Sequence, residues 1–153
     1  MEKIASFTVD HTRLLPGLYL SRRDGEITTF DLRFKRPNTG DLLTNSEMHS
    51  AEHLIATLLR NSPEKDAVIY FGPMGCQTGF YFLFDSRRLT DGEAIGLLQR
   101  VFSAAAVYDD AMPGSSAVEC GNFTNLSVKE GRRVCAFYAG VIANWTVEQL
   151  QDA

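Results

Sequence analysis

Two histidines and a glutamate lie within one short segment, at a spacing that suits a metal site. The pattern H-x-x-E-H is formed by His49, Glu52 and His53. Residues at positions i, i+3 and i+4 of a helix share one face, so these side chains should project to the same side. Two imidazoles one turn apart can hold one metal ion, while a carboxylate beside them moves protons. Because the chain has only three histidines, a chance pair on a helix surface is a weak alternative.

A third metal ligand must come from another part of the chain. Catalytic metals usually have three protein ligands and one open position. The candidates are the remaining thiols and two carboxylates: Cys76, Cys120, Cys135, Glu119 and Glu130. Cys135 lies in an apolar stretch of a predicted helix, which favours a place in the core. Spacing does not separate the other four.

Cys76 follows the glycine-rich run Gly72-Pro73-Met74-Gly75, between two predicted strands. Loops at strand ends often carry functional side chains, and glycines allow the backbone to approach a ligand closely. We therefore interpret Cys76 as reactive rather than buried and inert. The three cysteines include no C-x-x-C pair, so we expect reduced thiols and no disulfide framework.

The metal motif should lie on a buried helix. The capping-box pattern Thr44-x-x-Glu47 predicts its start, and Pro63 its end. Apolar residues surround most of its circumference: Met48, Ala51, Leu54, Ile55, Leu58 and Leu59. The face with the histidines should therefore line a pocket.

The other elements predict an α+β domain. Strands are indicated at 5–9, 17–22, 26–35, 67–71 and 79–84. Helices are indicated from Thr90 to about Tyr108 and from Ser127 to about Ile142, with a short one from Thr146. Strict β-α alternation is missing, so we expect one domain, residues 1–153, with an antiparallel sheet packed against helices on one face.

The clearest strand separates two kinds of side chain by alternation. Phe30, Leu32 and Phe34 should face the core, and Asp31 and Arg33 the opposite, polar face. Taken alone, Arg33 is best interpreted as a solvated charge or as the partner of Asp31 in an ion pair.

Composition narrows the class of protein. The chain has 153 residues, 44% hydrophobic and 22% charged, which is ordinary for a globular protein. The net charge of −4, without a basic run, argues against nucleic acid as a partner. There is no apolar run of membrane-spanning length and no signal-peptide pattern at the start, so we expect no membrane partner and a cytoplasmic protein.

Five segments carry a more specific pattern. They are Ser6-Phe7-x-x-Asp10-His11, Phe30-Asp31-Leu32-Arg33-Phe34-x-x-Pro37-Asn38, His49-x-x-Glu52-His53, Gly72-Pro73-Met74-Gly75-Cys76-Gln77-Thr78-Gly79-Phe80-Tyr81 and Glu119-Cys120-Gly121-Asn122. In this order and spacing they resemble the S-ribosylhomocysteine lyase (LuxS) family over nearly the whole chain. P-M-G-C-x-T-G together with H-x-x-E-H makes the resemblance highly specific.

The resemblance implies a homodimer with two active sites at the subunit interface. His49, His53 and Cys120 would bind one divalent metal per subunit, with water or substrate in the fourth position. Fe(II) would be native, and Zn(II) or Co(II) could replace it, which suits such a ligand set. His11 of one chain could serve the site of the other.

The same resemblance implies the reaction. S-ribosylhomocysteine would be cleaved to homocysteine and 4,5-dihydroxy-2,3-pentanedione, the precursor of autoinducer-2, by two carbonyl migrations and a β-elimination. Cys76, as a thiolate stabilised by cationic neighbours, and Glu52 would be the acid/base pair. Four residues would surround the substrate: Ser6, Phe7, His11 and Arg33.

Tyr70 departs from the family pattern, which commonly has an aspartate six residues before the loop cysteine. That acid is associated with the amino group of homocysteine, so we expect altered contacts there.

Two other classes of protein share part of the pattern. A metallohydrolase or peptidase of the inverzincin type also has H-x-x-E-H, but this class leaves Cys76 and its glycine loop unexplained. A non-catalytic sensor would use Cys76 and Cys120 to react with oxidants. A sensor would bind metal and become oxidised without releasing a product.

Overall fold

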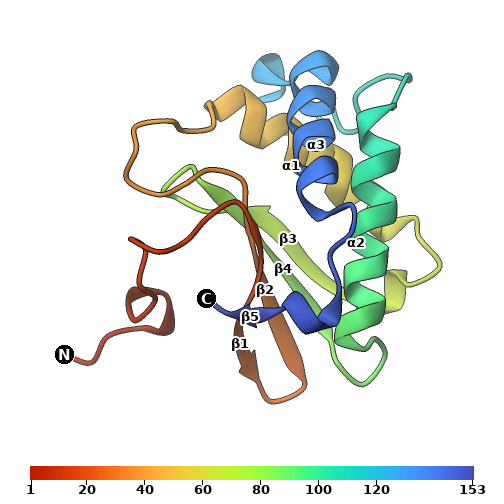
Figure 1. Cartoon of the computed structure of the whole chain (residues 1–153). Coiled ribbons are helices and arrows are strands. Elements are labelled where there is room, and N and C mark those ends of the chain that lie inside the picture. Colours follow the sequence, from red (N-terminus) through yellow and green to blue (C-terminus); the bar gives the residue numbers. More distant parts are fainter.

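A tight hairpin begins the sheet in the computed structural model, which describes residues 1–153 (Figure 1). Strands β1 (Gly17–Asp24) and β2 (Ile27–Arg33) pair antiparallel around it. Gly25 has a φ of 59°, a conformation that glycine adopts without steric cost. The predicted turn at Asp24-Gly25 is confirmed.

Three more strands complete a five-stranded sheet in the order β3-β4-β2-β1-β5. Strands β3 (Val68–Pro73) and β4 (Gly79–Asp85) extend the antiparallel part beside β2. The two-residue strand β5 (Gln151–Asp152) pairs parallel with β1. The expectation of an antiparallel sheet is therefore wrong at this edge, because the chain reaches β5 only after a long helical connection.

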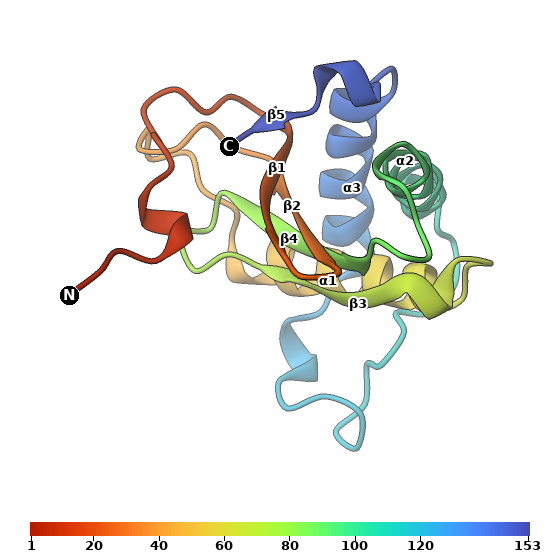
Figure 2. The same cartoon turned by 90° about the horizontal axis from the view of Figure 1, so that it is seen from below.

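Three long helices pack against one face of the sheet (Figures 1 and 2). They are α1 (Asn45–Arg60), α2 (Asp91–Ala106) and α3 (Val128–Ile142). Thr44 and Thr90 form complete capping boxes, and the Ser127 side chain accepts a hydrogen bond from the backbone of Glu130, as expected from the sequence. With 15 or 16 residues each, these helices lack the length and apolar character needed to cross a membrane.

The core lies between the helices and the sheet. Phe30, Leu32 and Phe34 are fully buried in it, which confirms the predicted inward face of β2. The rings of Phe34 and Tyr138 stack with centroids 4.1 Å apart, which joins the sheet to α3. Cys135 is fully buried nearby, as predicted.

Short 3-10 turns occupy four other places: η1 (Ala5–Phe7), η2 (Lys65–Ala67), η3 (Phe123–Asn125) and η4 (Val147–Gln149). The strand predicted at 5–9 is therefore wrong, since the free edge of β1 is taken by β5 instead. The N-terminal segment lies away from the helices (Figure 2). The long connection between α2 and α3 protrudes beside α1 in the same view.

Candidate active site

His49 and His53 on α1 meet Cys120, which comes from the connection between α2 and α3. Their ligand atoms all lie within 4.8 Å of one another. The Cys120 sulfur is 3.3 Å from Nε2 of His49, and the two imidazole rings are 4.6 Å apart between centroids. The structure thus brings the three expected ligands together as a candidate metal site.

The other candidate ligands are occupied elsewhere. Glu119 accepts a hydrogen bond from Ser116, and Glu130 forms an ion pair with Arg133. Burial raises the pKa of the Cys135 thiol to about 12, so this residue stays protonated in the core. Cys76 lies in a cavity that neither His49 nor His53 lines, so Cys120 is the thiol that the fold supplies to the two histidines.

Backbone and side-chain acceptors orient both imidazoles. Nδ1 of His53 lies 2.8 Å from the carbonyl oxygen of Pro113, and Nδ1 of His49 lies 2.5 Å from Oδ1 of Asn125. A carbonyl oxygen only accepts, so Nδ1 of His53 carries the proton and Nε2 is free to bind a metal. Gly114 has a φ of 69°, and a Cβ there would lie 3.1 Å from the His53 ring. Glycine thus allows the connection to approach this ligand.

The donor set fits a catalytic divalent metal. Two imidazole nitrogens and one thiolate are ligands that Zn(II), Fe(II) and Co(II) accept, and three protein ligands leave a position open. The hydrogen bonds on the outer nitrogens are the kind that orient histidine ligands in metalloproteins.

Glu52 lies on the same face of α1 and is half-buried. It lines a shallow cavity of about 290 Å³ with His53 and Gly114. Its carboxylate forms no side-chain hydrogen bond or ion pair within the chain, unlike Glu47 on the same helix. A free carboxylate beside the metal ligands is suited to proton transfer.

A second cavity, of about 330 Å³, contains Cys76. Its lining includes all four residues expected around the substrate: Ser6, Phe7, His11 and Arg33. The turn η1 and the residues after it carry the first three, and Arg33 comes from the end of β2. The Cys76 thiol is exposed, so a substrate can reach it.

Arg33, which lines this cavity, is held in a buried ion pair with Asp31. Asp31 and Arg33 are 2% and 1% exposed, and Nη2 of Arg33 donates to Asp31 over 2.5 Å. Burial raises the pKa of the Asp31 carboxyl, and the Arg33 guanidinium partly offsets the effect. The face of β2 expected to be polar is polar, but it is closed to solvent.

The hydroxyl of Thr78 connects the Arg33 guanidinium to the Cys76 thiol. Nη1 of Arg33 donates to Oγ1 of Thr78 over 2.7 Å and lies 3.8 Å from the Cys76 sulfur. Oγ1 of Thr78 is 3.0 Å from the same sulfur. Because Thr78 accepts from Arg33, its own hydrogen is free to point at Cys76.

The two cavities have no lining residue in common. Within one chain the expected site residues therefore form two groups. One group comprises the metal ligands and Glu52, and the other comprises Cys76 and the four residues around it.

Three contacts in these groups were not expected from the sequence. Thr78 belongs to the P-M-G-C-x-T-G motif, and its position two residues after Cys76 is a sequence signal for this contact. Asn125 and Pro113 are single residues in an irregular connection, and the Pro113 contact uses only the backbone. No sequence pattern marks either of them.

The chain is similar to proteins of one family along nearly its whole length. The sequence model of the S-Ribosylhomocysteinase (LuxS) family matches residues 4–148. An S-ribosylhomocysteine lyase of Desulfotalea psychrophila is 46% identical over 143 residues, covering 90% of this chain and 89% of the relative. The S-ribosylhomocysteine lyases of Finegoldia magna and Clostridium beijerinckii are each 40% identical, with at least 97% of both chains covered. The fold, the clustered histidines and cysteine, and these matches together mean that the chain belongs to the LuxS family of S-ribosylhomocysteinases.

Proposed function

We propose that the protein cleaves S-ribosylhomocysteine to homocysteine and 4,5-dihydroxy-2,3-pentanedione, the precursor of autoinducer-2. The observation that carries the proposal is the cluster of His49, His53 and Cys120 with the unpaired carboxylate of Glu52 on the same helix face. The relatives named above are lyases for this substrate and align over nearly their full length, which supports the same chemistry here.

This reaction requires two groups that move protons. The sulfur of the substrate is attached to C5 of the ribose and cannot leave while the carbonyl is at C1. Each carbonyl shift removes a proton from the carbon next to the carbonyl and returns one to the neighbouring position. When the carbonyl has reached C3, loss of the C4 proton expels the homocysteine thiol from C5.

His49, His53 and Cys120 are the residues that would hold the metal. A bound divalent ion supplies Lewis-acid polarisation of the sugar oxygens. Fe(II) is our choice for the native ion, and Zn(II) or Co(II) would fit the same donors. The cavity lined by His53 and Glu52 would give the sugar access to this cluster.

Cys76 is the group that we assign to the carbonyl shifts. As a thiolate it accepts the proton from the carbon beside the carbonyl. As a thiol it then returns the proton to the former carbonyl carbon. Thr78 and Arg33 both direct hydrogens at the sulfur, so each can donate a hydrogen bond to it. Asp31 holds Arg33 in this orientation.

Glu52 is the group that we assign to the elimination. Its carboxylate has no partner to compete for the incoming proton, and it stands next to the metal ligands. Ser6, Phe7 and His11, which also line the Cys76 cavity, would contact the substrate around the sulfur and the sugar.

We further propose that a homodimer completes each site. Phe7 at the Cys76 cavity is 68% exposed, and Phe123 beside the Cys120 loop is 37% exposed. Exposed aromatic side chains at both groups suit burial against a second copy. In a dimer with twofold symmetry, Cys76 of each chain would lie beside the metal ligands of the other chain, so each dimer would have two complete sites.

The direct test is anaerobic turnover. Protein loaded with Fe(II) should release free thiol from S-ribosylhomocysteine, as measured with a colorimetric thiol reagent. Cys76→Ala should keep its metal and lose turnover, and Cys120→Ala should lose the metal. A loaded protein that releases no thiol would contradict the proposed substrate.

A further inference from the structure

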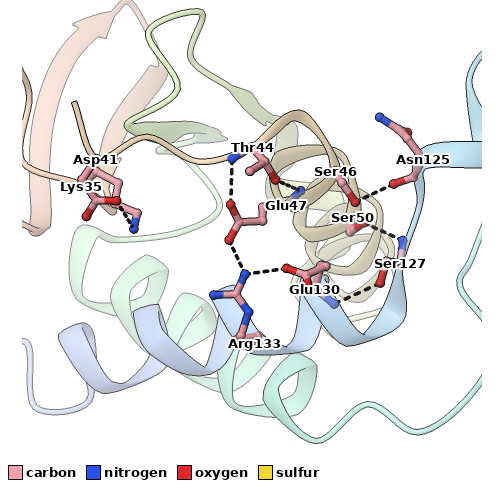
Figure 3. A network of polar contacts seen from close by, with 10 residues as sticks. All are labelled: Lys35, Asp41, Thr44, Ser46, Glu47, Ser50, Asn125, Ser127, Glu130 and Arg133. Atoms are coloured by element: carbon pink, nitrogen blue, oxygen red, sulfur yellow. Dashed lines mark hydrogen bonds and ion pairs between the residues drawn. The ribbon is translucent and has the colours of Figure 1, made fainter.

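The segment that supplies Cys120 has little regular structure to hold it. Between α2 and α3 it contains only the turn η3, yet the metal site needs its thiol beside His49. Two serines of α1 fasten the end of this segment (Figure 3). Oγ of Ser46 donates to the carbonyl oxygen of Asn125 over 2.7 Å, and Oγ of Ser50 accepts from the backbone of Ser127 over 2.8 Å.

These serines lie on the same face of α1 as the metal ligands. Ser46, His49, Ser50 and His53 follow the spacing i, i+3, i+4 and i+7, which places them along one side of a helix. The fastening contacts therefore hold Asn125 next to His49.

The side chain of Asn125 uses both ends of its amide. Nδ2 donates to Oδ1 of Asn45, and Oδ1 faces Nδ1 of His49 at 2.5 Å. An amide oxygen only accepts, so Nδ1 of His49 must carry the proton. The lone pair of Nε2 is then available on the side of the ring where the Cys120 sulfur lies, 3.3 Å away.

The two histidines differ in the group that fixes their tautomer. His53 is oriented by the backbone carbonyl of Pro113, which a substitution cannot remove. Asn125 is the side chain that performs this role for His49. The contribution of an outer acceptor to the metal site can therefore be measured at position 125.

We propose that Asn125 is a positioning residue of the metal centre, which holds His49 as the Nδ1–H tautomer with Nε2 directed at the metal position. The proposal rests on the metal site of the proposed function, but not on the substrate or on turnover. Its test uses metal affinity and histidine tautomers. The Asn125 proposal can therefore fail while the lyase proposal stands, and the lyase proposal can fail while the Asn125 proposal stands.

The experiment compares Asn125→Leu, which has similar size but no acceptor, with Asn125→Asp, which keeps an oxygen toward His49. Zn(II) and Co(II) dissociation constants are measured by competition with a chromophoric chelator. Removing such an outer partner weakens metal binding about 10- to 100-fold, which is the loss expected for Leu, while Asp should stay within about threefold of the original protein.

Arg133→Ala serves as the matched control. Arg133 belongs to the same group of polar contacts in Figure 3 and pairs with Glu47 and Glu130, but it touches no metal ligand. It should lower thermal stability and leave the metal dissociation constants unchanged.

A second readout needs no metal. Two-bond ¹H–¹⁵N correlation spectra resolve the tautomers of the three histidines in the metal-free protein. His49 should be the Nδ1–H form in the original protein and in Asn125→Asp, and should gain the Nε2–H form in Asn125→Leu. If Leu prevents folding, Asn125→Ser replaces it, because the serine hydroxyl is too short to reach Nδ1. Unchanged affinity and tautomer in the acceptor-free variant, or equal loss in Asp, would overturn the proposal.

Discussion

The ion pair of Asp31 and Arg33 determines which groups surround the Cys76 thiol. Both side chains are almost completely buried, and the guanidinium reaches Asp31 on one side and Thr78 and the sulfur on the other. In a buried pair each charge offsets part of the desolvation penalty of the other, and losing one member leaves the other charge without compensation. Stability and, in the proposed mechanism, the reactivity of Cys76 therefore depend on the same side chain, Arg33.

Arg33→Met should lower the free energy of unfolding by about 3–5 kcal/mol, because Asp31 would remain buried without its partner. The double variant Asp31→Asn/Arg33→Met should recover most of that loss but not the activity. Urea unfolding followed by circular dichroism measures the free energy of unfolding of both variants. Equal stability of the single variant and the original protein would contradict the buried pairing.

Glu52→Gln should bind metal normally but turn over about 10²–10⁴-fold more slowly, because the amide cannot accept the proton. Metal content measured by atomic emission and thiol release measured on the same sample separate the two effects. Normal turnover in this variant would remove Glu52 from the mechanism.

Residue-level expectations succeeded where a motif was local. The histidine pair and the buried state of Cys135 were predicted from short patterns, and both are found. The third ligand could not be chosen by spacing, because Cys120 and Glu119 lie in a segment without periodicity. A contact between distant parts of the chain separates them, because Cys120 lies beside His49, whereas Glu119 accepts a hydrogen bond from the nearby Ser116.

At the scale of elements, the beginning of α1 is held by Glu47 in two ways. Its side chain accepts from the backbone of Thr44 within the capping box, and it pairs with Arg133 of α3 (Figure 3). Burial opposes ionisation, but these hydrogen bonds outweigh it and keep the pKa of Glu47 below its ordinary value. The stabilisation is complete above the unfolded pKa of about 4.3 and disappears as the pH falls through the lower folded value.

Glu47→Gln keeps a capping side chain but loses the charge. The variant should therefore be less stable than the original protein by about 1 kcal/mol at pH 7, because the ion pair with Arg133 is partly exposed. The difference should be smaller at pH 3. Urea unfolding at the two pH values gives the comparison, and a difference that grows on acidification would be the opposite of what the lowered pKa requires.

The contact between α1 and α3 is close because Gly131 has no side chain. A Cβ at this position would lie 2.9 Å from Leu54 and 3.2 Å from Ser50. Gly131→Ala should cost about 1–3 kcal/mol of stability through overpacking. Gly140→Ala, in the same helix with open space around it, should be neutral or stabilising and serves as the control. Thermal unfolding of the two variants distinguishes them, and equal melting temperatures would refute the close packing.

The elements themselves were predictable where the signals are local. The capping boxes and the hairpin turn place α1, α2 and β1–β2 within a few residues of where they occur. Strand β5 could not be predicted, since two residues carry no pattern and its pairing with β1 depends on how the three strands and three long helices between them pack. The same pairing takes the edge that an N-terminal strand would need.

At the scale of the whole molecule, the division of the site into two cavities is the central feature. Glu52 and His53, one of the three candidate metal ligands, line one cavity and Cys76 another, with no shared lining. The model of the LuxS family matches residues 4–148, which include both groups of residues. A hydrolase would leave the Cys76 group unexplained, and a thiol sensor would not require Glu52 to stand free beside the metal ligands.

The most direct test that Cys76 and Glu52 of one site come from different chains mixes two inactive variants. Glu52→Gln and Cys76→Ala are unfolded together, refolded and loaded with Fe(II), and thiol release from S-ribosylhomocysteine is followed. Half of the dimers should be mixed, and one of the two sites in each should be intact, so about a quarter of the original activity should return. Refolding Glu52→Gln with the double variant Glu52→Gln/Cys76→Ala gives no intact site and should stay inactive. If the first mixture also stays inactive, Cys76 and Glu52 do not come from different chains, and the proposed dimeric site is wrong.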